Sequence, residues 1–135
     1  MSFNPHIVLY TDWFIPSKNY AAYSWGPIIC IRKKHELDEP LLAHEQTHSK
    51  QFWRTFGTHG IWYMLKKSYR YKSELEAYAV QIAKSIELKY IYTDPLSLQK
   101  TYKHYGSVIS KYYNLDVDVS EASRVLKIKV EQILK

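Results

Sequence analysis

Two histidines and a glutamate occur within five consecutive residues of this chain, at His44, Glu45 and His48. Residues four positions apart project from the same face of a helix, so His44 and His48 can reach one metal ion together. Glu45 lies beside them and is not needed as a ligand, which leaves its carboxylate free to take a proton from a nearby water. The pattern His-Glu-x-x-His (HExxH) therefore predicts a catalytic zinc centre.

Two histidines do not complete such a centre, because catalytic zinc normally has three protein ligands and one position left for water or substrate. A third ligand must lie elsewhere in the chain. Residues 73–78, Ser-Glu-Leu-Glu-Ala-Tyr, offer two carboxylates at the start of a later predicted helix. Glu74 and Glu76 are therefore the candidates for the third position.

These two motifs together resemble the gluzincins, the thermolysin-like zinc peptidases in which a glutamate on a second helix completes the ligand set. The Glu-Leu-Glu-Ala stretch that begins at Glu74 is similar to the Glu-x-x-Ala motif of many small members. The resemblance implies Glu74 as the third ligand. Helix geometry supports Glu74 over Glu76, because Glu74 shares a face with Ala77 and Tyr78, and the small Ala77 permits close approach of the metal-bearing helix.

The motif also continues to Gln51, which gives His-Glu-x-x-His-x-x-Gln. This pattern resembles a group of small bacterial and phage-encoded metallopeptidase-like proteins that begin with a strand pair and carry a Glu-x-Glu-Ala element further along the chain. The resemblance covers about residues 24–82 and does not extend over the C-terminal third. The longer motif of the metzincins is absent, because Arg54 stands where their third histidine would be. Gln51 itself is interpreted either as a hydrogen-bond partner of a ligand or as a surface residue.

The resemblance implies peptide-bond hydrolysis at Zn²⁺ held by His44, His48 and Glu74, with Glu45 as the general base. It also implies that the strand Ile28–Arg32 lies at the edge of the sheet and pairs with an extended substrate, although an ordinary core strand fits the same residues. A tetrahedral oxyanion needs a further donor. The candidates from sequence are Tyr78, Tyr71, Tyr102 and His104, and the sequence does not choose among them. The other histidines, His6, His35 and His59, lie outside any ligand spacing and are predicted at the surface.

Length and composition predict one zincin-like domain over residues 1–135, with the sheet and metal-site helices in 1–93 and a helical extension in 94–135. The single cysteine, Cys30, excludes an internal disulfide and is predicted to be a buried thiol. A net charge of +6 is interpreted as a solvated surface. No signal peptide or membrane-spanning stretch is apparent, so we expect a cytoplasmic protein, in the host cytoplasm if it is phage-encoded. Oligomeric state and substrate specificity are not readable from the sequence.

The order of elements predicts an α+β fold, in which a small N-terminal antiparallel sheet precedes a helical core and C-terminal helices. Extended, β-branched or aromatic runs predict the strands, and capping residues with apolar periodicity predict the helices. The predicted strands are Ile7–Tyr10 and Ser24–Arg32; the predicted helices run from Asp38–Pro40 to about Thr55, over Ile61–Leu65, from Lys72 or Ser73 (as N-cap) to about Tyr90, from Asp94–Pro95 to Tyr113, and from Ser120 (as N-cap) to Lys135.

Two other functional classes remain open from the sequence. The stretch from Val119 to Ile128 is similar to the first helix and turn of a helix-turn-helix, with the small Ala122 at the crossing, which would favour nucleic-acid binding. The second helix would be too short to fill a major groove. A zinc-stabilised binding protein without catalysis is the other alternative, but structural zinc sites usually have four protein ligands, often cysteines, and this chain has one cysteine.

Overall fold

Three short strands form a small sheet near the N-terminus of the computed structural model, which describes residues 4–135. The strands are β1 (Ile7–Tyr10), β2 (Ala22–Trp25) and β3 (Ile28–Ile31), in the spatial order β1-β3-β2. β2 runs antiparallel to β3, whereas β1 runs parallel to it. The α+β class is confirmed, but the sheet is mixed rather than wholly antiparallel. The connection over residues 11–21 passes the position that β3 later fills, so β2 runs opposite to β1, and β3, after one more reversal, lies between them parallel to β1.

The predicted strand Ser24–Arg32 is a β-hairpin. Gly26 adopts a φ of +63°, a left-handed conformation that glycine accepts without a Cβ clash, and the chain reverses at Gly26 and Pro27. β3 then lies between β1 and β2, so the prediction that residues 28–32 form an edge strand is wrong. The edge strand on the other side of the hairpin is β2.

Five α-helices follow a short 3₁₀ helix at Lys33–His35. They are α1 (Glu39–Arg54), α2 (His59–Leu65), α3 (Lys67–Glu87), α4 (Pro95–Tyr112) and α5 (Val119–Leu134). The predicted start of α1 is confirmed, since the Asp38 side chain accepts a hydrogen bond from the Leu41 N–H and Pro40 occupies the first turn. Asp94 caps α4 in the same way.

Two predicted helix starts are wrong. α3 begins at Lys67, so Ser73 is a buried residue within the helix and not its N-cap. α5 is capped by Asp118, whose side chain accepts from the Ser120 N–H, so Ser120 is already helical. In α3 the residues before Ser73 continue the helix, and Tyr71 packs against the core cluster, whereas in α5 the local cap at Asp118 sets the earlier start.

The predicted turn of a helix-turn-helix in the C-terminal segment is also wrong. α5 is one continuous helix from Val119 to Leu134, with no turn near Ile128. Ala122 is fully buried, and next to it α5 crosses α4, where a Cβ on Gly106 would come within 3.0 Å of the Val119 carbonyl oxygen. The small residues serve packing of α5 against its neighbour.

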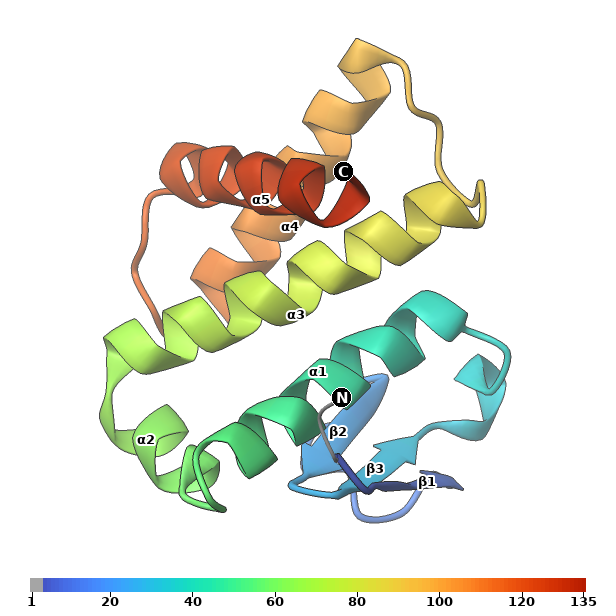
Figure 1. The fold of residues 1–135 in the computed structure, drawn as a ribbon, viewed down its shortest axis with the longest axis vertical. Coiled ribbons are helices and arrows are strands. Elements are labelled where there is room, and N and C mark those ends of the chain that lie inside the picture. The colour runs from blue at the N-terminus through green and yellow to red at the C-terminus, as the bar shows by residue number, and fades with distance from the viewer. Residues whose placement is uncertain (1–3) are drawn as a thin grey trace.

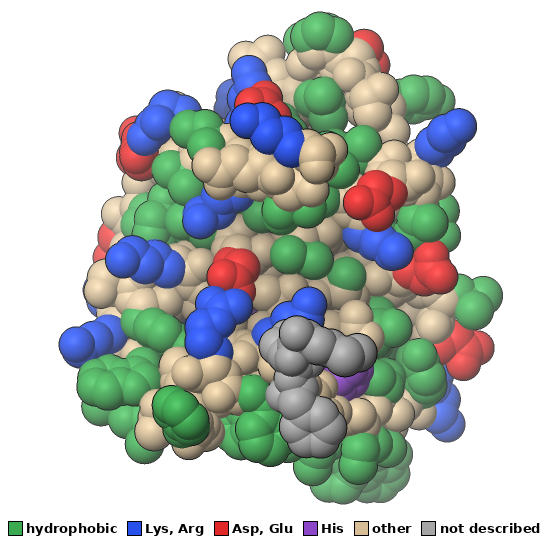
Figure 2. Space-filling view, in the orientation of Figure 1, with side chains coloured by type: hydrophobic (Ala, Val, Ile, Leu, Met, Phe, Trp, Pro, Cys, Tyr) green, Lys and Arg blue, Asp and Glu red, His purple; other side chains and the backbone are tan. Residues whose placement is uncertain are grey.

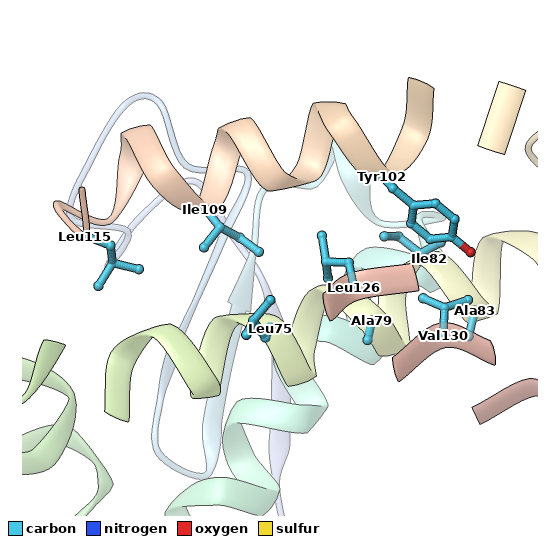
Figure 3. Close-up of a cluster of buried hydrophobic side chains, with 9 residues drawn as sticks. All are labelled: Leu75, Ala79, Ile82, Ala83, Tyr102, Ile109, Leu115, Leu126 and Val130. Carbon is cyan, nitrogen blue, oxygen red and sulfur yellow. The ribbon is translucent and has the colours of Figure 1, made fainter. Parts of the chain in front are cut away.

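The core has two parts, on opposite sides of the pair formed by α1 and α3 (Figure 1). α3, α4 and α5 enclose the apolar cluster of Figure 3, in which Leu75 and Ile82 of α3 meet Ile109 of α4 and Leu126 of α5. The sheet packs on α1 through Ile29 and its neighbours. Within the described part of the chain, no helix combines the length and the apolar character needed to cross a bilayer.

Candidate metal centre

α1 and α3 lie against each other and bring together the three residues predicted as metal ligands. One donor atom from each of His44, His48 and Glu74 lies within 4.8 Å of the others, and all three side chains are buried. Glu74 Oε2 lies 3.6 Å from His44 Nε2, and Glu74 Oε1 lies 3.2 Å from His48 Nε2. Two imidazoles and a carboxylate in this arrangement could hold a metal ion.

Glu74 is held so that one carboxylate oxygen remains without a hydrogen bond. The Tyr63 hydroxyl of α2 donates to Glu74 Oε1 at 2.7 Å. Glu74 Oε2 is buried and has no hydrogen-bond partner among the described residues. A buried carboxylate oxygen without a donor costs free energy unless a cation or another group satisfies it, so this atom fits a metal ligand.

His48 is oriented by Gln51, one turn further along α1. The Gln51 amide nitrogen donates to the Ser73 carbonyl oxygen at 3.0 Å, and a carbonyl can only accept. The Gln51 amide oxygen must therefore face His48 Nδ1, 2.8 Å away, and accept its proton. With the proton on Nδ1, the lone pair of the neutral imidazole is on Nε2, which points at Glu74.

Further contacts anchor the Gln51 side chain itself. The Ser73 hydroxyl donates to the same amide oxygen at 2.5 Å, and the amide nitrogen also donates to Glu76 Oε1 at 3.2 Å. Arg54 donates to both carboxylate oxygens of Glu76. Glu76, the alternative third ligand, is thus engaged away from the histidines, and Glu74 is the carboxylate at the centre.

Coupling between these groups shifts their pKa values strongly. Burial alone would lower the pKa of His48, but the adjacent Glu74 carboxylate outweighs it and raises that pKa to about 9. Burial alone would raise the pKa of Glu74, but His48 and His44 hold it well below its usual range. Without a metal the centre is thus a buried ion pair in which His48 carries the extra proton at neutral pH.

Glu45 lies next to the ligands and borders open space. Its side chain is buried, and burial raises the pKa of its carboxyl against the opposing effect of His44 and His48. With His44 it lines a cavity of about 350 Å³ between the segment Asn19–Ala22 and the helices α1, α3 and α4. A small molecule or an extended chain in that cavity would meet the Glu45 carboxylate and one face of the candidate metal centre.

α2 contributes two side chains that sequence reasoning did not assign to the site. Tyr63 is the donor to Glu74, and His59, predicted at the surface, is half-buried beside His48 with ring centroids 5.9 Å apart. Burial and the neighbouring His48 lower the pKa of His59 to about 4, so its ring is neutral at pH 7. His59 and Tyr63 are four residues apart in α2, and that i, i+4 spacing was the available signal.

Of the four proposed oxyanion donors, the structure brings only Tyr78 to the site. Its ring packs edge-on against His44 with centroids 4.3 Å apart, and it lines the cavity. Tyr102 is buried in the cluster between α3, α4 and α5, Tyr71 packs against that cluster, and His104 is exposed on α4. On β2, burial together with Tyr20, Glu45 and Glu74 raises the pKa of Tyr23.

Comparison with protein families, curated proteins and solved structures finds no match for this chain. The site therefore has to be interpreted from its own residues and geometry.

Proposed function

We propose that this protein is a zinc-dependent peptidase of the gluzincin type. The observation that carries the proposal is the convergence of His44, His48 and a Glu74 carboxylate oxygen without a hydrogen bond on one buried point beside a cavity. Two imidazoles and one carboxylate are a ligand set used by catalytic zinc. When bound, the ion would supply Lewis acidity and lower the pKa of a water molecule toward neutrality.

Residues of the chain itself would carry out the proton transfers. Glu45 is the residue on the cavity side with a carboxylate that is not needed as a ligand. We assign it the role of general base, which accepts a proton from the attacking water and passes it to the leaving amine. Its raised pKa favours the first of these steps, because a more basic carboxylate accepts the proton of the attacking water more readily.

The edge strand β2 offers a place for an extended substrate. The Arg32 N–H donates to the Ala21 carbonyl oxygen at 3.0 Å, so residues 21, 23 and 25 direct their backbone groups toward β3. The N–H and C=O groups of Ala22 and Ser24 consequently face the free edge. Ala22 also lines the cavity with Glu45, so a peptide paired with this edge would pass in front of the candidate metal centre.

Metal analysis and peptide digestion with three variants test the proposal. Purified protein should contain about one zinc per chain, and His44→Ala or Glu74→Ala should lose it. Glu45→Gln should keep the zinc but lose hydrolysis of a mixed peptide library followed by mass spectrometry. Glu39→Gln, an exposed change on the same helix, is the matched control and should behave as wild type.

Three results would reject parts of this assignment. Stoichiometric zinc in His44→Ala would show that the ligand set is wrong. Zinc-dependent cleavage that persists in Glu45→Gln would remove Glu45 as the base, and a zinc-loaded wild type without any cleavage would favour a non-catalytic zinc-stabilised binding protein.

A further inference from the structure

The outer side of α2 and the loop before it carry large apolar side chains in solvent. Phe56 is 94% exposed, Met64 77%, Leu65 75% and Ile61 58%. Exposed apolar residues that occur singly are normal, but several within one short segment mark an interaction surface. We call this surface the α2 patch; it consists of Phe56, Ile61, Trp62, Met64 and Leu65.

α2 has two distinct sides. His59 and Tyr63 face inward, where they contact His48 and Glu74 respectively. The patch residues occupy the remaining positions of the helix and the preceding loop, and none of them is buried. The same helix thus closes one side of the candidate metal centre and presents its apolar residues outward.

Basic residues flank the patch without acidic residues among them. Residues 54–70 contain four Lys or Arg residues and no Asp or Glu. The four are Arg54, Lys66, Lys67 and Arg70. Figure 2 shows hydrophobic side chains gathered over α2, at the lower left, with Lys and Arg side chains next to them over the start of α3.

Arg70 Nε is buried and its guanidinium carbon lies 5.9 Å from the centre of the inward-facing Tyr63 ring, so the exposed rim consists of Arg54, Lys66 and Lys67. The charges of this rim are only partly neutralised within the protein. Lys67 Nζ lies 4.0 Å from an oxygen of Asp116, but both side chains are more than half exposed, so water screens the pair. Glu76 pairs with Arg54, whose side chain is also mostly exposed. Lys66 Nζ lies 4.8 Å from the centre of the Trp62 ring, which places a cation directly at the apolar surface.

We propose that the α2 patch binds the surface of a bilayer that contains anionic phospholipids. Apolar side chains enter the boundary between headgroups and acyl chains, Trp62 lies at headgroup level, and the basic rim pairs with lipid phosphates. A helix of seven residues is about 10 Å long, which suits this shallow position and cannot span a bilayer.

The high exposure of the patch favours lipid over a protein partner. Side chains exposed by three quarters or more project from the surface and do not line a groove. A protein partner would need pockets matched to each of them, whereas lipid chains rearrange around projecting side chains of any shape. The proposal does not depend on metal binding or on peptidase activity.

Co-sedimentation with vesicles tests the proposal on the full chain. Wild type should bind phosphatidylcholine vesicles that contain about one third phosphatidylserine, bind pure phosphatidylcholine far less, and dissociate as salt rises. The double variant Met64→Asp/Leu65→Asp should bind at least roughly a hundredfold more weakly. Lys66→Gln/Lys67→Gln should weaken binding by roughly thirtyfold.

The matched control changes two apolar residues at the far end of the molecule. Tyr92 and Leu96 are 82% and 61% exposed near the start of α4, so Tyr92→Asp/Leu96→Asp makes the same chemical change in a comparable environment. This variant should bind vesicles as wild type does. Thermal unfolding followed by circular dichroism should show that all variants are folded.

Quenching gives a measurement on the unmutated surface. Lipids brominated in the acyl chain should quench wild-type tryptophan fluorescence, and Trp62→Phe should lose most of that quenching. Absence of wild-type binding to anionic vesicles, or equal binding by Met64→Asp/Leu65→Asp, would overturn the proposal. Equally, a wild-type dimer that ignores vesicles and becomes monomeric in this variant would identify a second copy of the chain as the occupant.

Discussion

Replacement of Gln51 by leucine tests whether the orientation of His48, and not only its presence, contributes to metal binding. The Gln51 amide oxygen accepts the His48 Nδ1 proton at 2.8 Å inside the protein, and leucine has a similar volume but no acceptor. Ser73, the other donor to this oxygen, can turn its hydroxyl to the carbonyl four residues earlier in α3, so its loss costs little. The two acceptors of the Gln51 amide nitrogen also keep partners, because the Ser73 carbonyl lies inside α3 and Glu76 still accepts from Arg54. The expected effect is therefore that of one buried unpaired donor on His48.

The expected losses of stability and of zinc affinity follow from this single lost hydrogen bond. A buried donor left without an acceptor costs about 1–3 kcal/mol, and we expect Gln51→Leu to reduce the free energy of unfolding of the metal-free protein by that amount. Loss of the bond that fixes a histidine ligand typically lowers metal affinity by roughly 10–100-fold. Urea unfolding measures the first quantity, and competition for zinc with a chromophoric chelator measures the second.

Two variants control the interpretation. Gln46→Leu makes the same change on the same helix, where the side chain hydrogen-bonds to His6 in an exposed position, and both quantities should stay near wild type. Gln51→Glu keeps an acceptor for His48 Nδ1 and should retain most of the zinc affinity. If Gln51→Leu binds zinc as tightly as wild type while its stability falls, Gln51 is a structural residue and does not position the ligand.

Two further predictions concern protons and packing. Because Glu74 outweighs the effect of burial and raises the pKa of His48 to about 9, His48 carries a proton at pH 7 that zinc must displace. Calorimetry in buffers of different ionisation enthalpy should therefore find at least one proton released per zinc at pH 7. Well above pH 9 the His48 share should disappear and leave only the proton lost by zinc-bound water, with apparent affinity rising between the two; no release at pH 7 would contradict the coupling. Gly106→Ala would bring a Cβ within 2.5 Å of Ser123 Oγ where α4 crosses α5, so its free energy of unfolding should fall by about 1–3 kcal/mol. Gly60→Ala, with no atom within 4 Å of the added Cβ, should leave the urea midpoint unchanged or raise it, and equal effects of the two changes would refute the packing argument.

The helices were largely predictable because their signals are local. Asp38 with Pro40, and Asp94 with Pro95, mark helix starts through contacts within three residues, and the structure confirms both. Starts that depend on distant packing were not predictable. Ser73 has the composition of an N-cap, but its hydroxyl is used by Gln51 of another helix, and α3 begins six residues earlier.

In the candidate site, too, some features follow from local sequence patterns and others depend on distant packing. The sequence by itself determined which residues could bind a metal, because the spacing of His44 and His48 fixes a shared helix face and Glu74 lies on a later predicted helix, α3 in the structure. Only the tertiary structure decided which atoms face one another: the Gln51 amide against His48, Tyr63 against Glu74, and β2 instead of β3 as the free edge. The physical reason is range, since periodicity and capping act over a few residues, whereas these contacts depend on how α1, α2, α3 and the hairpin pack together.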